Sequence, residues 1–504
     1  MAAEKYQPVT TLVLGGFLGA LLPLAFAPYD LPFIALLSLA LFLLILRPLS
    51  APRAAAVGYA FGWGYFAHGV YWVYFSIHHF GHAPLWLAII IMLGMVAILA
   101  LYVALFAYLL NRFFNQHIAV RYLLAFPSMW VGLEALRGIL FTGFPWLSLG
   151  YSQVDTWLAG WAPIVGVLGV SWLVVLTTGA ILCFISAVEK KHKLLAAVVM
   201  LLVWPSALLL AEVSWTKPIG ETIKVALLQG NVPQEIKWLR SFRQTNNDIY
   251  MQMTRQQRDV DLVVWPETAV PAFFHRVENT LISALKREAE TRHIDVVLGL
   301  PVMPEGESNY YNGLHSVRYS NDFYLKRHLV PLGEYLPLKP MSTIILDFLK
   351  IPMSDFSAGD GEQPLLKGAG YPFASSICYE DVFQQTSIDG LPEAAYLVNV
   401  SNDTWFGDTI APYQHLQMAR MRALESGRYL LRSTNTGLTA IVDPKGHITG
   451  IAPMFKRFSL TGEITPLTGA TPFVRGGWWL IFVLTFTMVL ISFLKRDVKR
   501  KGEE

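Results

Sequence analysis

The chain has few cysteines and few charged residues. Only 2 of its 504 residues are cysteines, Cys183 and Cys378, which excludes a disulfide framework and leaves free thiols. Charged residues make up 15% of the chain and hydrophobic residues 54%, against about 25% and about 45–50% in ordinary globular proteins. We therefore expect part of the protein to lie in lipid.

Two further features are missing. The net charge is only +3, and no basic patch is interleaved with aromatic residues, so we exclude nucleic acid as a partner. No metal-ligand spacing appears either. The cluster of His78, His79 and His82 lies at the end of an apolar segment, where interfacial polarity explains it better than metal binding. We expect neither a metal nor a cofactor.

The apolar residues are concentrated in two parts of the chain. Because a membrane-spanning helix needs about 20 apolar residues, we predict about eight spanning helices. The predicted ranges are 9–27, 31–46, 55–78, 84–111, 118–138, 163–187, 194–213 and 477–494. This divides the chain into a helical bundle of seven spans at 1–213, a soluble domain at 214–475, and a last span with a basic tail at 476–504.

Lys and Arg are distributed asymmetrically among the connections between these spans. They occur in alternate connections and in both tails, whereas the loops near 28–30, 79–83 and 139–162 contain none. Positive charge marks the cytoplasmic side. Both termini are therefore predicted to be cytoplasmic, with the soluble domain on the opposite side of the membrane.

The soluble region alternates short β-rich apolar runs with helical patterns. Strands are predicted at 222–229, 261–265 and 294–300, and helices at 240–258 and 278–292. Such alternation favours an α/β fold. Further strands are predicted at 314–319, 323–329, 373–379, 395–400, 429–434 and 438–443. The nearly continuous apolar strands indicate a sheet that is covered on both faces.

Three motifs carry possible chemistry at predicted strand ends. Glu267 follows a strand that Pro266 halts, Lys326 lies in a β-like run, and Cys378 lies near the end of the run 373–379. Each alone has an ordinary structural explanation: a solvated loop acid, an edge-strand lysine, a packed cysteine. Together they supply a base, an ammonium and a nucleophile, and this combination favours a catalytic site.

The order of these motifs resembles the nitrilase (carbon–nitrogen hydrolase) superfamily, whose members use a Glu-Lys-Cys triad. With seven predicted spans before the soluble domain and one after it, the whole chain resembles the apolipoprotein N-acyltransferase family. The resemblance implies a nitrilase-like αββα sandwich joined to a transmembrane helical domain. Further matching residues are Gln229–Asn231, Gly143–Trp146, Ser401–Phe406, Gln414, His415, Met418–Arg420 and Arg432–Asn435.

The resemblance also implies residue roles. Glu267 would be the general base, Cys378 the nucleophile, and Lys326 the stabiliser of the thiolate and of the oxyanion, assisted by the backbone N–H of Tyr379. Glu334 would orient Lys326 or position the amine. Candidate substrate contacts are Trp238, Glu380, Asn402 and Trp405, and an apolar lid is expected at 335–337 and 345–351.

The implied reaction is a ping-pong acyl transfer in the bacterial inner membrane. A phospholipid, commonly phosphatidylethanolamine, would acylate Cys378, and the diacylglyceryl-cysteine amine of an apolipoprotein would then take the acyl chain. Membrane lipids would surround the bundle, and the catalytic domain would be periplasmic. Two alternatives remain open: a membrane-tethered amidase that hydrolyses a small amide, and a catalytically inactive lipid or lipoprotein receptor.

Overall fold

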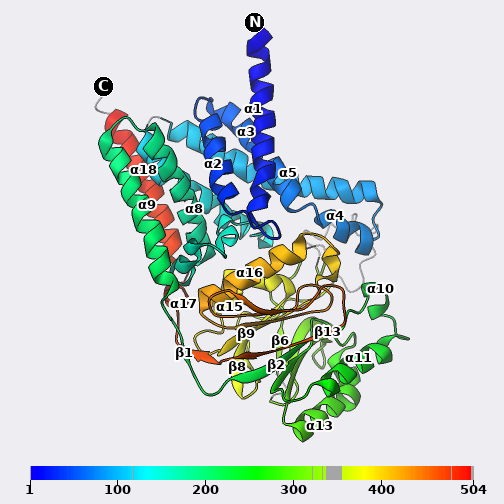
Figure 1. Ribbon diagram of the computed structural model, residues 1–504. Coiled ribbons are helices and arrows are strands. Elements are labelled where there is room, and N and C mark those ends of the chain that lie inside the picture. Colours follow the sequence, from blue (N-terminus) through cyan, green and yellow to red (C-terminus); the bar gives the residue numbers. More distant parts are fainter. Residues whose placement is uncertain are drawn as a thin grey trace. The chain divides into compact units, whose positions relative to one another are not determined.

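The computed structural model describes residues 2–115, 117–319, 322–331, 333–335, 355–477 and 479–500 (Figure 1). The chain forms two structural units. The first comprises Met1–Tyr74, Pro84–Val213 and Arg475–Glu504, and the second comprises Phe75–Ala83 and Ser214–Val474.

The first unit is built of helices, and each of the eight apolar ranges predicted from the sequence overlaps one. Pro, Gly or polar residues separate them, as expected where a helix has to end. The main helices are α1 Ala2–Leu21, α2 Phe33–Leu46, α3 Ala51–Gly69, α5 Leu85–Phe113, α7 Phe126–Arg137, α8 Ala162–Ser186, α9 Lys190–Ala211 and α18 Trp479–Arg500. A short helix α6 (Ile118–Val120) and a π-turn (Arg121–Ala125) precede α7.

Length and composition qualify a subset of these helices as membrane spans. Among the described residues, three segments are long and apolar enough: Leu85–Phe113, Trp157–Ser186 and Lys190–Ala211. Three shorter apolar helices lie at Val9–Ala25, Phe33–Leu46 and Trp479–Leu494. The total of eight spans therefore stays a prediction.

The structure corrects the end of the third predicted span. Helix α3 ends at Gly69, whereas the sequence predicted one helix to residue 78; the short helix α4 (Val73–Phe75) and a π-turn (Ser76–Phe80) follow after a break, and Phe75–Ala83 belongs to the second unit. Aromatic residues beyond Gly69 pack against protein. Trp72, for example, lies 4.9 Å from the ring of Trp146. Hydropathy alone does not separate residues that face lipid from residues that face protein.

Glycines bring helices α1 and α3 into close contact. A Cβ atom added at Gly64 of α3 would lie 1.9 Å from the carbonyl oxygen of Gly16, and one added at Gly19 of α1 would lie 1.9 Å from that of Phe61. Small residues at such crossings are typical of helices that associate in a bilayer, where close van der Waals packing replaces the hydrophobic effect.

The second unit contains two six-stranded sheets. The first has the order β13-β2-β3-β4-β5-β6, with β2, β3 and β4 parallel and the flanking strands antiparallel. Its strands are β2 Ile223–Gln229, β3 Leu262–Val264, β4 Asp295–Val302, β5 Tyr311–Ser316, β6 Phe323–Leu325 and β13 Phe458–Ile464.

The second sheet has the order β12-β11-β10-β9-β8-β7, and again its central strands β8, β9 and β10 are parallel. Its strands are β7 Leu366–Gly368, β8 Tyr371–Ile377, β9 Tyr396–Ser401, β10 Leu430–Thr434, β11 Ala440–Val442 and β12 Ile448–Ile451. A separate two-stranded ribbon pairs β1 (Lys217–Pro218) with β14 (Leu467–Thr468).

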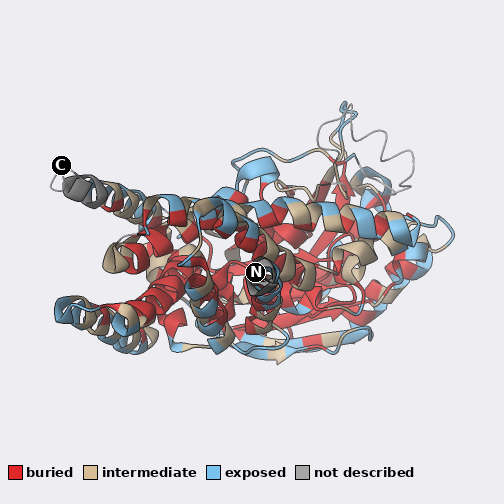
Figure 2. Ribbon diagram, turned by 90° about the horizontal axis from the view of Figure 1, so that it is seen from above, coloured by how far each residue is buried: buried red, intermediate tan, exposed pale blue. Residues whose placement is uncertain are grey.

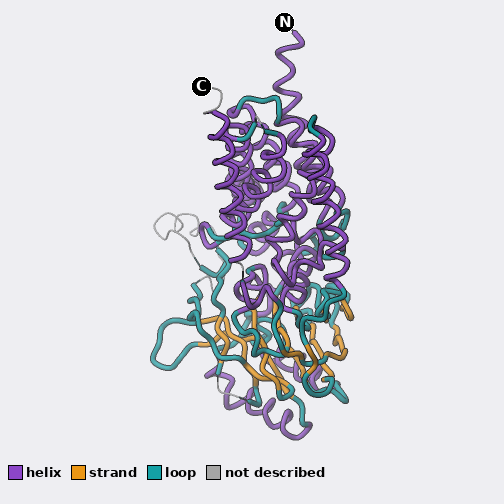
Figure 3. Tube along the Cα trace, turned by 90° about the vertical axis from the view of Figure 1, so that its left-hand side faces the viewer, coloured by secondary structure: helices purple, strands orange, loops and turns teal. Residues whose placement is uncertain are grey.

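Alternating side chains join the two sheets and the helices that cover them. Val225 and Leu227 of β2 face the core between the sheets, whereas Ala226 and Leu228 face the core beneath α11 (Arg243–Gln256) and α13 (Ser283–Arg292). On the far side, α16 (Ala411–Ser426) packs on β9 and β10. Figure 1 shows α11 and α13 on one side of the sheets and α16 on the other, and Figure 3 shows the strands of this unit gathered together, with helices of the same unit below them.

The predicted α/β sandwich is therefore confirmed for the second unit. Its central strands, such as β2, β4 and β9, are buried almost throughout, because both faces of each sheet are covered there (Figure 2), whereas the edge strands β12 and β13 are largely exposed. Each strand predicted from the sequence overlaps an observed one. The sequence analysis did not identify helix α16 or the strands β7, β12 and β13.

The glycine contact between α1 and α3 makes a testable prediction. Gly64→Val should destabilise the chain by about 3 kcal/mol or more, because backbone rather than a flexible side chain blocks the new Cβ. Gly94→Val is the matched control, since Gly94 of α5 is exposed and has no atom near its added Cβ. We would compare thermal melting of the purified chain in detergent; equal melting of both variants would contradict the close contact.

Candidate functional site

The three predicted catalytic residues all follow strands of the two sheets. Glu267 comes three residues after β3, Lys326 directly after β6, and Cys378 directly after β8. Ligand sites in α/β sheets gather where strands end. All three side chains are buried: Glu267 is 6% exposed, Lys326 0% and Cys378 7%.

Cys378 lies on a strained turn rather than in a strand. The sequence predicted a strand through residue 379, but β8 ends at Ile377, and Cys378 opens the 3₁₀ turn Cys378–Val382 with a φ of 53°. A non-glycine residue in this left-handed region costs about 1–3 kcal/mol and persists only where its surroundings fix it. Because Cys378 lies on this turn, the direction of its side chain is not set by the alternation of side chains along β8.

Lys326 lies between two carboxylates. Its Nζ donates to Glu334 Oε1 at 2.8 Å and lies 3.6 Å from Glu267 Oε1. The Nδ2 of Asn312 joins the same acids, at 2.7 Å from Glu267 Oε1 and 3.3 Å from Glu334 Oε1. The backbone N–H of Lys326 also donates to the Asn312 carbonyl at 2.8 Å. The alternative of an edge-strand lysine in water is wrong for this position.

The charges of this site act on one another. Burial alone would lower the pKa of Lys326, but Glu334 and then Glu267 raise it well above its usual value, so the ammonium stays charged. Burial, and then the charge of Glu267, raise the pKa of the Cys378 thiol, and Lys326 offsets this only in part. The resting cysteine is therefore a thiol, and its proton has to move to a base when the sulfur attacks.

Glu334 is held by its own loop. Its Oε2 accepts a hydrogen bond from the Val330 N–H at 2.8 Å, and its carbonyl accepts one from the Phe356 N–H at 2.9 Å. Its Oε1 takes the bond from Lys326. These contacts favour the orienting role over the amine-positioning role among the two expected from the sequence.

Glu380 is a structural anchor in this geometry. Its Oε1 accepts the backbone N–H groups of Arg327 at 2.6 Å and His328 at 3.1 Å, and its Oε2 accepts the Tyr324 hydroxyl at 2.9 Å and the Ile377 N–H at 2.8 Å. Four donors occupy the carboxylate, which is 0% exposed. Glu380 therefore ties the Cys378 turn to the loop that begins at Lys326, and its expected contact with substrate stays a prediction.

A buried charge cluster supports the same turn, and the sequence analysis did not assign it. Its members are Asp381, Asp403, His415 and Arg432. The Nε2 of His415 lies 2.7 Å from Asp381 Oδ1 and 3.3 Å from the Cys378 carbonyl oxygen, and Arg432 contacts both aspartates at 2.7 and 3.0 Å. Burial would raise the pKa of Asp403, but Arg432 and then His415 hold it well below its usual value.

The remaining expected substrate contacts lie in different settings. Asn402 is buried and structural: its Nδ2 donates to Gln234 Oε1 at 2.9 Å, and its Oδ1 accepts the Thr404 hydroxyl at 2.8 Å. Trp238 is half-buried directly after the short helix α10 (Gln234–Lys237). A substrate contact stays a prediction for Trp238 and is disfavoured for Asn402.

Trp405 contacts the segment Phe75–Ala83. Its ring lies 5.1 Å from that of Phe80, and its carbonyl accepts the Ser76 hydroxyl at 2.6 Å. The positive φ of Gly407 and the Phe75 ring, 2.3 Å from where its Cβ would stand, both require glycine there. This half-buried tryptophan therefore helps to hold Phe75–Ala83 in the second unit.

Lys237 is a second buried lysine near Glu267, and sequence reasoning missed it. Its Nζ donates to the Glu267 carbonyl oxygen at 3.2 Å and to the Thr268 hydroxyl at 2.8 Å. Burial lowers its pKa to about 8, although the charge of Glu267 opposes this. A lysine in the apparently solvated segment after Pro233 gave no signal of burial.

The role of the Tyr379 backbone N–H stays a prediction. Of the expected lid, Tyr335 is described and half-buried, but residues 336–337 and 345–351 lie outside the described part of the chain. Within the described part, no group of three or more His, Cys, Asp or Glu side chains is arranged to hold a metal ion.

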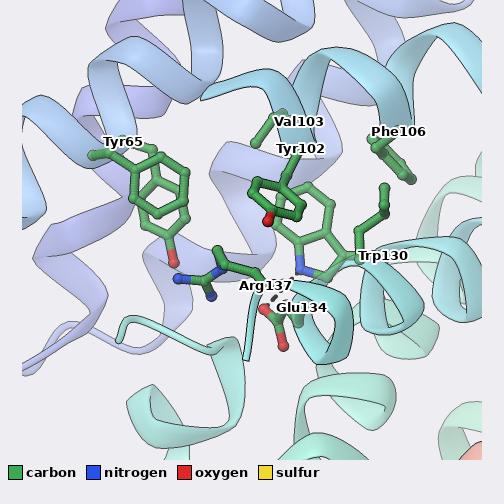
Figure 4. Close-up of a pocket in the computed structure, with 9 residues that line it drawn as sticks. Tyr65, Tyr102, Val103, Phe106, Trp130, Glu134 and Arg137 are labelled. Carbon is green, nitrogen blue, oxygen red and sulfur yellow. Dashed lines mark hydrogen bonds between the residues drawn. The ribbon is translucent and has the colours of Figure 1, made fainter. Parts of the chain in front are cut away.

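The first unit has a hollow between α3, α5 and α7, lined in part by Tyr65, Trp130, Glu134 and Arg137 (Figure 4). Arg137 donates to the carbonyl oxygens of Phe144 and Trp146, and Glu134 Oε1 accepts the Leu149 N–H at 3.0 Å. The two charges of the fifth predicted span therefore hold the loop that carries the Gly143–Trp146 motif. This assigns them a structural role.

Two family models match the chain. The model described as "Apolipoprotein N-acyltransferase N-terminal domain" matches residues 18–180, and the one described as "Carbon-nitrogen hydrolase" matches residues 224–473. The second match bears out the nitrilase-like fold that the sequence resemblance implied.

Curated relatives match over nearly the full length. A protein named apolipoprotein N-acyltransferase from Methylococcus capsulatus is 47% identical over 480 residues, covering 95% of both chains. One of the same name from Azotobacter vinelandii is 42% identical over 489 residues, covering 96% of this chain and 94% of its own. Among solved structures, yeast Nit3, a nitrilase-superfamily member, is 20% identical with a TM-score of 0.38, covering 50% of this chain and 92% of its own.

The four hydrogen bonds to Glu380 predict a loss of stability on neutralisation. In Glu380→Gln the amide nitrogen would face donors instead of accepting from them, so we expect a destabilisation of about 2 kcal/mol. Glu393→Gln, at an exposed position, is the control and should change little. We would measure the melting temperatures of both variants. A melting temperature of Glu380→Gln equal to that of the wild type would contradict the anchoring role.

The lowered pKa of Lys237 predicts a pH-dependent stability. Above about pH 8 the folded chain has released a proton that the unfolded chain keeps up to the ordinary lysine pKa, so raising the pH favours the folded state. Between pH 7 and pH 9.5 the wild type should gain roughly 2 kcal/mol relative to Lys237→Met. We would measure unfolding of both proteins at the two values; a constant difference would show that Lys237 has an ordinary pKa.

Proposed function

We propose, because this chain belongs to the apolipoprotein N-acyltransferase family, that it transfers an acyl chain from a phospholipid to the N-terminal amine of diacylglyceryl-cysteine on apolipoproteins. The names of its full-length relatives support lipoprotein N-acylation. The observation that carries the proposal is the buried set of Glu267, Lys326 and Glu334 joined by Asn312, with Cys378 on a strained turn. This set supplies a base, an oxyanion stabiliser and a nucleophile.

In the first half-reaction the Cys378 sulfur attacks the ester carbonyl of the phospholipid. The thiol proton moves to Glu267, which suits a resting cysteine of raised pKa. The Lys326 ammonium and the Tyr379 N–H stabilise the tetrahedral oxyanion. The carbon–oxygen bond of the ester then breaks, Glu267 returns the proton to the leaving alkoxide, and a lysophospholipid departs from the thioester.

In the second half-reaction the amine of the diacylglyceryl-cysteine attacks the thioester. Glu267 takes the proton from the attacking nitrogen, the carbon–sulfur bond breaks, and the proton returns to the sulfur. An amide and a free Cys378 thiol result. Glu334 keeps Lys326 in place through both halves, since its hydrogen bond uses one of the three ammonium donors and leaves others for the oxyanion.

Both substrates carry lipid chains, which explains a membrane domain on a hydrolase-like fold. We propose residues 1–213 and 476–504 as the transmembrane part and 214–475 as a periplasmic catalytic domain, with both termini cytoplasmic in the bacterial inner membrane. The distribution of Lys and Arg supports this orientation. Phosphatidylethanolamine is the proposed donor, and Trp238, which directly follows Lys237, is a proposed substrate contact.

Intact-mass measurement tests the thioester. Wild-type chain mixed with phosphatidylethanolamine micelles should gain one long acyl chain, which neutral hydroxylamine removes. Cys378→Ala should gain none, whereas Cys183→Ala should behave as the wild type, because Cys183 is buried in α8 of the first unit. Lys326→Met should slow adduct formation by about 10²–10³-fold.

Other outcomes point elsewhere. No adduct from any lipid, together with release of ammonia from small amides, would replace the acyltransferase by a membrane-tethered amidase. No adduct and no hydrolysis with a titratable Cys378 thiol would indicate an inactive receptor. An adduct that never passes to the amine of a diacylglyceryl lipopeptide would contradict the proposed acceptor.

A further inference from the structure

The turn that carries Glu267 is strained and held from several sides. Thr268 has a φ of 45°, in the left-handed region that a β-branched residue rarely adopts. Below the turn, Gly299 of β4 leaves room for it, since an added Cβ would lie 2.8 Å from the Glu267 Cα. From α11, Asn246 Nδ2 donates to the Ala269 carbonyl at 2.6 Å.

Lys237 contacts the two residues at the centre of this turn. Its ammonium donates to the carbonyl oxygen of Glu267 and to the side chain of Thr268, on either side of one peptide bond. It is 1% exposed. These two acceptors are neutral, and a charge buried against neutral acceptors is costly, so stability alone does not account for a lysine here.

The orientation of the turn decides where the Glu267 carboxylate lies. Its Oε1 accepts Asn312 Nδ2 at 2.7 Å and lies 3.6 Å from Lys326 Nζ. A rotation of the peptide after Glu267 would move this oxygen away from both. Lys237 is thus a second cation beside Glu267, which acts on its backbone while Lys326 acts on its carboxylate.

Helix α10 links this turn to a second one. Gln234, at the start of α10, accepts the Asn402 amide at 2.9 Å, and Lys237 at its end holds the Glu267 turn. The turn after β9 and the turn after β3 are therefore joined through a four-residue helix, which Trp238 follows directly.

We propose that Lys237 is a positioning residue for Glu267, fixing the strained Glu267–Thr268 turn so that the carboxylate faces Asn312 and Lys326. This inference rests on the proposed function, in which Glu267 is the base for Cys378. It assigns α10 the task of aligning the base, and it gives a reason for a buried lysine that touches no carboxylate directly.

The kinetic test uses Lys237→Met and Lys237→Arg in the full chain with phosphatidylethanolamine micelles. Lys237→Met should slow acyl-enzyme formation at saturating donor by about 10²-fold, with half-saturation unchanged, because the base is displaced while lipid binding is not. Lys237→Arg keeps a cationic donor, so it should form the acyl-enzyme at least about tenfold faster than Lys237→Met. The proposal would be overturned if Lys237→Met changed only the donor concentration at half-saturation, or if it changed neither that concentration nor the rate.

Arg428→Met is the matched control for removal of a buried cation. Arg428 donates to the carbonyl oxygens of Ala394, Pro392 and Gly469 and has no contact with the catalytic residues among the described hydrogen bonds. It should lower the melting temperature and leave the acylation rate of the folded fraction unchanged. An equal slowing in both variants would show that Lys237 is merely structural.

A thiol-alkylation readout separates this proposal from the proposed function. In a Cys183→Ala background, Cys378 is alkylated with chloroacetamide, which needs the base but no lipid. Glu267→Gln and Lys237→Met should slow alkylation to a similar degree, even if the wild type forms no thioester. If Lys237→Met were alkylated at the wild-type rate while Glu267→Gln was alkylated slowly, the positioning role would be overturned.

Thr268→Val covers the case in which Lys237→Met does not fold. It removes one of the two acceptors of Lys237 and keeps the shape of the side chain. We expect alkylation and acylation to slow by about 3–10-fold, with Thr268→Ser close to the wild type. Equal alkylation and acylation rates for Thr268→Val and Thr268→Ser would contradict a role for the contact between Lys237 and the Thr268 hydroxyl.

Discussion

The Lys326 ammonium, buried between the carboxylates of Glu334 and Glu267, is the interaction on which the rest of the site depends. Burying an unpaired cation at 0% exposure would cost too much desolvation free energy. Two buried carboxylates without a cation would repel each other. Together, with Asn312 bridging the acids, they form a set whose members each need the others. The strand ends of β3 and β6 and the loop at Glu334 therefore have to meet at one place.

The turn that carries Cys378, the proposed nucleophile, is held by a different set of charges. Next to the Cys378 turn lie Asp381, Asp403, His415 and Arg432. These two carboxylates, one imidazole and one guanidinium have almost no contact with water. Such a cluster is weak evidence for stability, because desolvation offsets the attraction between its members. Its value is geometric: it fixes the backbone next to a strained residue, while Glu380 fixes the other side.

The sequence predicted the elements of this protein better than their contacts. Apolar periodicity placed the strands and the helical ranges, because burial on both faces leaves a pattern along the chain. The proposed triad could be predicted because Glu267, Lys326 and Cys378 lie in distinctive motifs. Lys237, Asn312 and Arg432 were not assigned roles, because their burial depends on partners more than 25 residues away. The end of α3 was misplaced for the same reason: an aromatic residue that packs on protein has the hydropathy of one that faces lipid.

The segment Phe75–Ala83 has a consequence for how the protein is made. It lies between two helices of the first unit, yet Ser76 and Phe80 bind Trp405, and Phe75 fills the space left by Gly407. The ribosome delivers this segment more than 300 residues before its partner. The hydrolase-like unit therefore cannot be completed by its own contiguous sequence, and a fragment cut at residue 214 would lack one piece of its structure. Completion of this unit therefore has to wait until the chain has been made beyond Gly407, however early the segment Phe75–Ala83 is made.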